Sequence, residues 1–278
     1  MPYLEYEPGK KLYYECHGHS GPVIIMLHGL ASSSRIWIRQ VHALQKYGQV
    51  YTFDFPGHGK SDSLQTYSLT EITVLLKFLM DELDIQQASL IAISLGCSVA
   101  LTFAAYYPGR VDKLILEGPV GGYHPWWNPL GLPDQIVFIV FPFLIKLSIA
   151  IFGYHAVAHW INTFGVKAKR NFKILETLQN QTDFKAIREL LWDCAIAPYA
   201  NLLAQVSAPT LLIRGQNDPM PRHFVDYIRT HLEKVNYIEV PNTRHLVAME
   251  KPREFNAMVI NFLNLIPIHR KKTHENSA

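Results

Sequence analysis

The stretch that decides the fold runs from Ala88 to Gly96 and reads ASLIAISLG. Its first part, Ala88 to Ile93, is a predominantly apolar run of the kind that forms a strand buried on both faces of a sheet. Ser94 follows at once, and the chain then continues as an apolar helical segment to Tyr107. A serine on so tight a strand-to-helix turn has its hydroxyl pushed out above the sheet, and small residues two before and two after it let strand and helix approach closely. The sequence therefore predicts that Ser94 stands at the carboxyl end of a buried strand.

Similar apolar runs lie on both sides of this stretch. They span residues 22–27, 50–55, 111–117, 210–214 and 235–240. Helical patterns lie among them at 68–83, 221–232 and 252–265. Near the amino terminus, residues 3–7 and 11–16 flank a turn and predict a β-hairpin. Strands that alternate with helices in this way predict an α/β fold built on a parallel sheet.

The alternation is interrupted once, between Gly118 and about Ser207, by a stretch that reads as helical and apolar. We interpret residues 119–207 as a helical cap inserted into a core domain made of residues 1–118 and 208–268. Residues 269–278 begin with basic side chains and predict a flexible, solvated tail.

Composition narrows the class of protein. The chain has 278 residues, of which 49% are hydrophobic and 18% are charged, against about 25% charged in an average globular chain. A net charge of +3 from 26 basic and 23 acidic residues is too balanced to indicate a nucleic-acid partner. The three cysteines are widely spaced and form neither a disulfide framework nor a zinc motif. The first residues lack the layout of a signal peptide, so we expect a cytoplasmic location.

Two further residues complete a catalytic pattern with Ser94. A serine hydroxyl is a poor nucleophile and needs a base that is held by a third group. Asp218 lies in the loop after the run 210–214, and His245 lies in the loop after the run 235–240. Each of the three residues thus follows the carboxyl end of a predicted strand, and parallel strands bring those ends to one edge of the sheet.

These segments resemble the α/β-hydrolase superfamily. Residues 92–96 resemble its G-x-S-x-G turn, with Ala92 in place of the first glycine. Residues 245–255 resemble its histidine loop, although Arg244 replaces the usual glycine before the histidine and could narrow the loop or place a charge near the imidazole. The resemblance implies a cap-domain serine esterase or lipase-like member with a mostly parallel eight-stranded sheet, helices on both faces and a cap between the sixth and seventh strands. It also implies the catalytic triad Ser94, Asp218 and His245, with Glu117 as the rival acid.

The same resemblance implies an oxyanion hole made of backbone N–H groups. One belongs to Leu95, directly after the nucleophile, and the other to Leu30, in the loop after the first central strand. His28 in this loop is interpreted as a structural residue that braces it by hydrogen bonds. Residues 54–61, DFPGHGKS, resemble the family's D-x-P-G-x-G-x-S loop and are interpreted as a scaffold turn.

The cap contains a very apolar segment, residues 136–153, in which Lys146 is the single charge. Hydropathy alone makes it a membrane-spanning candidate, but a single span would separate Ser94 from Asp218 and His245. We therefore expect short apolar helices that line a lipophilic substrate pocket, with a second alternative in which this face dips into a membrane surface as a peripheral contact. The expected aromatic walls of that pocket are Trp126, Trp127, Phe138, Phe141 and Phe143.

The expected function is hydrolysis of an apolar carboxylic ester, such as an acylglycerol or another medium-chain acyl ester. Two enzyme alternatives use the same triad, a hydrolase of carbon–carbon bonds and a cofactor-free perhydrolase, and a non-catalytic small-molecule-binding or membrane-associated protein is the alternative from another class. No cofactor is expected, because no G-x-G-x-x-G follows a strand. No metal is expected either, since His155 and His159 have no third ligand at a recognisable spacing. The sequence leaves the oligomeric state open.

Overall fold

A computed structural model describes residues 2–120, 165–196, 199–220 and 222–267 of the chain. These residues form an eight-stranded sheet in the order β1-β2-β4-β3-β5-β6-β7-β8. The strands are β1 (Tyr3–Glu7), β2 (Lys10–His17), β3 (Val23–Leu27), β4 (Gln49–Phe53), β5 (Ala88–Ile93), β6 (Val111–Glu117), β7 (Thr210–Gly215) and β8 (Val235–Val240).

The sheet is mostly parallel, as the sequence predicts. Strands β1 and β2 form the antiparallel hairpin, and β2 also pairs antiparallel with β4. Every other neighbouring pair is parallel. The strand order reverses at β3, which lies between β4 and β5. In open α/β sheets, ligands bind outside the carboxyl ends of the strands at such a reversal.

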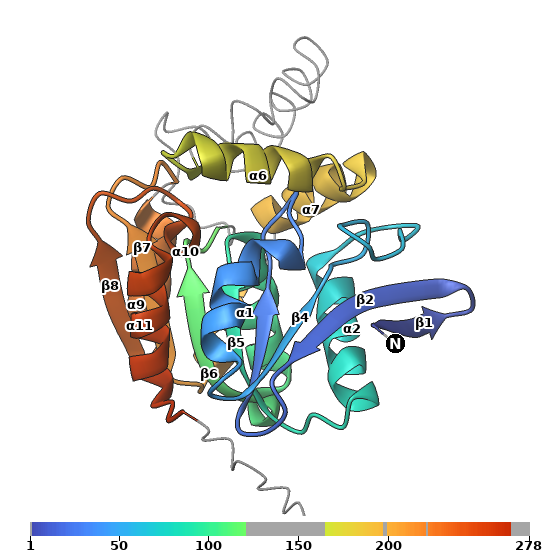
Figure 1. Ribbon diagram of the computed structural model, residues 1–278, viewed down its shortest axis with the longest axis horizontal. Helices are drawn as coiled ribbons and strands as arrows, with labels where there is room; N and C mark the ends of the chain where they lie inside the picture. The colour runs from blue at the N-terminus through green and yellow to red at the C-terminus, as the bar shows by residue number, and fades with distance from the viewer. Residues whose placement is uncertain (1, 121–164, 197–198, 221, 268–278) are drawn as a thin grey trace, which may run out of the picture.

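Helices cover both faces of the sheet (Figure 1). The principal helices are α1 (Ile38–Leu44), α2 (Leu69–Glu82), α3 (Leu95–Tyr106), α6 (Lys169–Gln179), α7 (Phe184–Ile196), α8 (Tyr199–Leu202), α9 (Arg222–His231), α10 (Val247–Glu250) and α11 (Pro252–Leu263). Three short 3₁₀ helices span Ser34–Trp37, Pro108–Arg110 and Leu203–Gln205. Two apolar clusters result, one shared by α2, α3 and α9 and the other by α1 and α11.

The central strand β5 contributes to both clusters, as its apolar sequence predicts. Leu90 and Ala92 face the cluster around α3, whereas Ile91 and Ile93 face the cluster around α11. All six residues of β5 are buried. Because the side chains of a strand alternate between its faces, this burial fixes the register of β5 and therefore the place where Ser94 leaves the sheet.

Some elements differ from the sequence prediction. The 3₁₀ turn Ser34–Trp37 and helix α1, between β3 and β4, were not predicted, and neither was the short helix α10. Strand β4 ends at Phe53, two residues before the predicted end at Phe55. The backbone N–H of Phe55 instead donates to His28 Nε2 at 2.9 Å, so the chain leaves the strand ladder to form the turn that follows.

Helices α6 and α7, which come from the predicted cap region, lie across the end of the sheet to which the central parallel strands point (Figure 1). Helix α7 is tied to the core because Glu189 Oε2 accepts the backbone N–H of Tyr67 at 3.0 Å and Asp193 accepts that of Leu69. Within the ranges described, no helix combines the length and apolar character needed to cross a membrane. The segment 136–153 lies outside the described residues, as does the basic tail.

The close approach of α3 to the end of β3 predicts the effect of adding a single methyl group at Gly96. A Cβ added at Gly96 would lie 2.6 Å from the carbonyl oxygen of Leu27 and 2.7 Å from that of His28. We therefore expect Gly96→Ala to lower the free energy of unfolding by about 1–3 kcal/mol, the usual cost of overpacking, as measured by urea titration.

Gly109→Ala is the matched control, since a Cβ at Gly109 would meet nothing within 4 Å. Its free energy of unfolding should stay within about 0.5 kcal/mol of the wild type. Equal midpoints for the two variants would mean that α3 does not pack this closely on the end of β3.

Candidate active site

Ser94 occupies a sharp turn between β5 and α3. Its backbone angles are φ 54° and ψ −120°, a region that L-residues rarely adopt outside functional sites. The turn is held on one side by the Ser94 N–H, which donates to the carbonyl of Glu117 at 2.9 Å, and on the other by the Cys97 N–H, which donates to the carbonyl of Ser94 at 2.9 Å. The predicted strand-to-helix turn at Ser94 is thus confirmed.

The loop after β3 lies against Ser94. A Cβ built on Gly29 would be 3.2 Å from the Cβ of Ser94. The next N–H along the chain belongs to Leu30, one of the two predicted oxyanion donors. The other, Leu95, is the first residue of α3, where an N–H has no acceptor within the helix.

His28 fixes the orientation of the Gly29–Leu30 peptide. Its Nδ1 lies 2.7 Å from the carbonyl oxygen of Gly29, and its Nε2 accepts the N–H of Phe55, so the proton of the ring resides on Nδ1. In a trans peptide the C=O and N–H point in opposite directions, so this bond aims the Leu30 N–H away from the His28 ring. The prediction that His28 braces the loop is confirmed.

Burial keeps two histidines that hydrogen-bond to the loop after β3, His28 and His58, neutral. Desolvation lowers the pKa of His28 to about 4, although its bond to the Gly29 carbonyl opposes the shift. Desolvation likewise lowers the pKa of His58 to about 3. His58 Nε2 accepts the N–H of Ala31 at 3.4 Å, and Ala31 itself has a positive φ of 54°. Both rings therefore act as uncharged hydrogen-bonding braces at neutral pH.

The segment 54–61 is the scaffold turn that the sequence predicts. The carboxylate of Asp54 accepts the N–H of Ser34 at 2.7 Å and that of Lys60 at 2.8 Å. The Ser61 hydroxyl donates to the carbonyl of Asp54 at 2.6 Å. Asp54 is 2% exposed, and its bonds both shape the segment 54–61 and tie it to the 3₁₀ turn that begins at Ser34.

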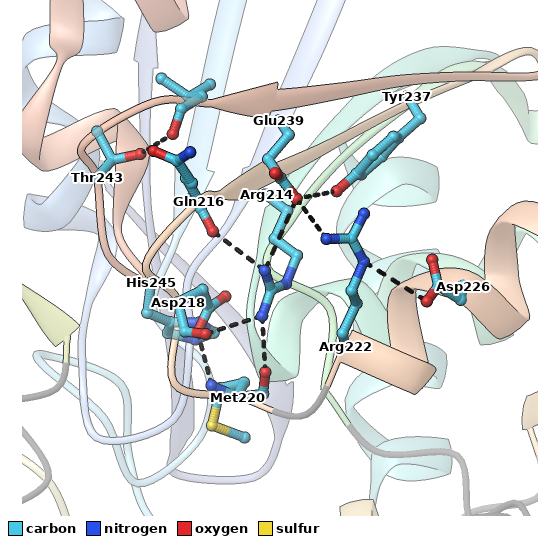
Figure 2. A network of polar contacts seen from close by, with 12 residues as sticks. Arg214, Gln216, Asp218, Met220, Arg222, Asp226, Tyr237, Glu239, Thr243 and His245 are labelled. Carbon is cyan, nitrogen blue, oxygen red and sulfur yellow. Dashed lines mark hydrogen bonds and ion pairs between the residues drawn. The ribbon is translucent and has the colours of Figure 1, made fainter.

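Asp218 and His245 form a hydrogen-bonded pair (Figure 2). Asp218 Oδ2 lies 3.0 Å from His245 Nδ1, and the side chains are 1% and 13% exposed. The other oxygen, Oδ1, accepts the N–H of Met220 at 2.9 Å. Burial would raise the pKa of Asp218, but the interaction with His245, the hydrogen bond from the Met220 N–H and the charge of Arg214 together hold the pKa below its usual range. The carboxyl is therefore an anion that accepts from the imidazole.

Two consecutive residues at the end of β6 link this pair to Ser94. The carbonyl of Glu117 accepts the Ser94 N–H, and Gly118 packs against the His245 ring. A Cβ at Gly118 would lie 2.8 Å from His245 Cε1 and 2.9 Å from Nδ1. The structure thus brings the turn at Ser94, the imidazole of His245 and the carboxylate of Asp218 to one place at the carboxyl edge of the sheet.

Glu117, the rival acid, has a different partner. Its Oε1 accepts the N–H of Ala248, at the start of α10, at 2.9 Å, while His245 Nδ1 is bonded to Asp218. Glu117 is completely buried, and desolvation raises its pKa to about 8, with the Asp218 charge adding to the shift. Glu117 is therefore neutral at pH 7 and anchors the helix that follows the histidine loop.

The histidine loop is also joined to the predicted cap region. Glu250 accepts the N–H of Arg244 through Oε2 at 2.6 Å and that of Lys167 through Oε1. The side chain of Arg244 donates to the carbonyl of Val166 at 3.2 Å, and the N–H of Leu246 donates to the carbonyl of Gly165 at 3.1 Å. The sequence pattern of residues 245–255 does not indicate this role of Glu250.

Other predicted site residues lie outside the described residues. These are the aromatic residues Trp126, Trp127, Phe138, Phe141 and Phe143. His155 and His159, for which no metal-binding role is expected, lie outside the described residues as well. Among the residues that are described, no group of three or more histidine, cysteine, aspartate or glutamate side chains could hold a metal ion.

Comparison with known proteins places the chain in a family. The model of the alpha/beta hydrolase fold matches residues 22–252, so the chain belongs to this family of hydrolases. A pimeloyl-[acyl-carrier protein] methyl ester esterase from Nitrosomonas europaea is 27% identical over 259 residues, covering 85% of this chain and 93% of the esterase.

Two further comparisons extend across nearly the whole chain. A 2-hydroxy-6-oxononadienedioate/2-hydroxy-6-oxononatrienedioate hydrolase from Paraburkholderia phymatum is 26% identical over 268 residues, covering 91% of each chain. The solved enol-lactonase of Burkholderia xenovorans LB400 superimposes with a TM-score of 0.80 at 20% identity, covering 95% of this chain and 100% of the lactonase, which shows the fold.

The raised pKa of Glu117 predicts how stability depends on pH. The pKa of the Glu117 carboxyl is 4.5 in the unfolded chain and about 8 in the folded protein. The stability that the neutral Glu117 carboxyl contributes is therefore fully present below pH 4.5. As the pH rises from 4.5 to about 8, the free energy of unfolding falls by roughly 1.4 kcal/mol for each pH unit.

Glu117→Gln removes the titration but keeps an oxygen that can accept the Ala248 N–H. The variant should gain stability relative to the wild type as the pH rises from 5 to 8 in urea titrations. A difference between the two proteins that stays constant over this range would show that the Glu117 carboxyl is already ionised in the folded state.

Proposed function

We propose that this protein is a serine hydrolase that cleaves apolar carboxylic esters through an acyl-enzyme on Ser94. The observation that carries the proposal is the Asp218–His245 pair, bonded at 3.0 Å and held beside the strained turn of Ser94 through Glu117 and Gly118. A serine, an imidazole and a buried carboxylate in this arrangement are the components of nucleophilic acyl transfer.

In the first half of the reaction, His245 Nε2 takes the proton of the Ser94 hydroxyl as Oγ attacks the ester carbonyl. The carbonyl oxygen becomes an oxyanion and accepts hydrogen bonds from the N–H groups of Leu30 and Leu95. When the carbon–oxygen bond to the alcohol breaks, His245 gives its proton to the departing alkoxide. The alcohol leaves, and the acyl group stays on Ser94.

The second half repeats these roles with water. His245 takes a proton from a water molecule as the water oxygen attacks the acyl carbonyl. The N–H groups of Leu30 and Leu95 bind the second oxyanion. The bond to Ser94 then breaks, the serine regains a proton from His245, and the carboxylic acid is released. Asp218 accepts from Nδ1 throughout, which keeps Nε2 facing the reaction and stabilises the imidazolium.

The assignment of an apolar ester rests on two supports. The chain is 49% hydrophobic with a cap sequence rich in aromatic residues, and large apolar side chains are what line sites for apolar ligands. The similar protein from Nitrosomonas europaea is named a methyl ester esterase. An ester with an acyl chain longer than acetyl is accordingly the proposed substrate class.

A second candidate is hydrolysis of a carbon–carbon bond, which the similarity to the Paraburkholderia phymatum hydrolase favours. The same serine and histidine would serve, but the leaving group would be a carbanion in place of an alkoxide. Purified protein assayed with a β-diketone and with an ester of matched acyl length distinguishes the two. Faster turnover of the ester supports the first candidate, and turnover of the diketone alone supports the second.

The direct test is a chain-length series of p-nitrophenyl esters on the wild type and on Ser94→Ala. We expect turnover that rises from acetyl to medium chains, and a loss of at least about 10³-fold in kcat in the variant, because the nucleophile is removed. Asp218→Asn should lower kcat by a similar factor, about 10²–10⁴-fold, because it disturbs the tautomer of His245.

Ser98→Ala is a matched control, since Ser98 is a buried serine one turn further along α3 and its hydroxyl donates to the carbonyl of Val120. It should keep activity near that of the wild type. Turnover that survives Ser94→Ala would reject Ser94 as the nucleophile, and a preference for acetyl over longer chains would reject the lipophilic substrate class.

A further inference from the structure

Arg214 is a charged side chain in a place where charges are rare. It lies near the carboxyl end of β7, the strand beside the edge strand β8, and is 6% exposed. Burying a guanidinium is costly unless hydrogen bonds and an opposite charge compensate it. The surroundings of Arg214 therefore indicate what its burial achieves.

The guanidinium is wrapped by the loop that carries Asp218 (Figure 2). Its Nη2 donates to the carbonyl of Asp218 at 2.8 Å and to that of Met220 at 3.0 Å. Its Nη1 lies 3.3 Å from the carbonyl of Gly215, which also accepts the Asp218 N–H. One side chain thus binds three carbonyls of a single short turn.

The same turn sets the direction of the carboxylate. Asp218 Oδ1 accepts the N–H of Met220 and Oδ2 bonds to His245 Nδ1. The backbone of Asp218 and the backbone of Met220 together orient this carboxyl group. Arg214 Nη2 donates a hydrogen bond to the carbonyl of each of these two residues. We propose that Arg214 is the positioning residue for the catalytic acid, fixing the Asp218 carboxylate against His245 by binding the carbonyls of its loop.

The opposite charge comes from outside the loop. Glu239 Oε2 lies 3.9 Å from Nη1 of Arg214 and 3.1 Å from Nη1 of Arg222, and it accepts the hydroxyl of Tyr237 at 2.9 Å. Arg222 is about half exposed and also pairs with Asp226. Glu239, on the neighbouring strand β8, thus supplies an opposite charge to the buried guanidinium, while the loop carbonyls accept its hydrogen bonds.

Lysine could not do the same. An arginine offers five N–H donors in a rigid planar fork, whereas a lysine ammonium is a single point with rotating donors. Arg214 uses two nitrogens at once. Nη1 lies near the Gly215 carbonyl and the Glu239 carboxylate, and Nη2 donates to the carbonyls of Asp218 and Met220. The inference rests on the proposed function, because a positioning role matters only if Asp218 serves His245 in catalysis.

The test compares Arg214→Met and Arg214→Lys with the matched control Arg222→Met. Arg222→Met removes a cation from the same glutamate but from none of the loop carbonyls. We expect both Arg214 variants to lose about 10²-fold in kcat for the ester, the effect of a small misplacement of a catalytic group. KM should be nearly unchanged, because Arg214 is not placed at the substrate. Arg222→Met should keep the kcat of the wild type.

A second readout does not depend on ester turnover. The proton between His245 Nδ1 and Asp218 should give a far-downfield proton NMR signal, assigned by its loss in Asp218→Asn. We expect this signal to shift or vanish in Arg214→Lys and to persist in Arg222→Met. If the wild type has the signal but no activity on any ester, the proposed function fails, and the signal alone still decides the role of Arg214.

Two results would overturn the role of Arg214. One is a folded Arg214 variant, judged by its urea midpoint, whose kcat equals that of Arg222→Met. The other is a downfield signal that is identical in Arg214→Lys and the wild type. Where Arg214→Met does not fold, Arg214→Lys, which keeps the charge and loses the fork, provides both readouts.

Discussion

The chain at Ser94 must pass within one residue from a strand buried on both faces to a helix packed on the same sheet, and this requirement shapes the site. A positive φ at a non-glycine residue costs on the order of 1–3 kcal/mol, and Ser94 adopts one. The bond from its N–H to Glu117 and the close approach of Gly96 to the end of β3 hold the turn in place. This strained turn places Ser94 at the carboxyl edge of the sheet, where the loops after β3, β6, β7 and β8 meet.

Burial then decides which groups near that serine carry charge. His28, His58 and Glu117 are titratable, fully buried and close to the loops of the site. Desolvation lowers the pKa of the two histidines to about 4 and about 3 and raises that of Glu117 to about 8. All three are neutral at pH 7 and act through hydrogen bonds. The charged partner of the His245 imidazole is the Asp218 carboxylate, which Arg214 helps to hold in place.

The sequence was sufficient for the parts of the fold that depend on local pattern. Strand β5 and the turn at Ser94 were predicted from an apolar run and two small residues. Asp218 and His245 were predicted from the resemblance to the hydrolase family together with their positions after predicted strands. Helix α1 was missed because its burial is shared with α11, far along the chain. The roles of Arg214 and Glu250 were missed because they depend on carbonyl and N–H groups that only the folded loops bring together. The one local signal for a role of Arg214 is that a charged residue lies near the end of a buried apolar strand.

The central claim is that Ser94 is an activated nucleophile. The most direct measurement is the intact mass of the folded protein after exposure to a fluorophosphonate, followed by peptide mapping of the adduct. We expect a single adduct on Ser94, which forms in the wild type and forms much more slowly in His245→Gln and after denaturation. A folded wild-type protein that takes up no adduct, or takes it up on another residue, would contradict the account.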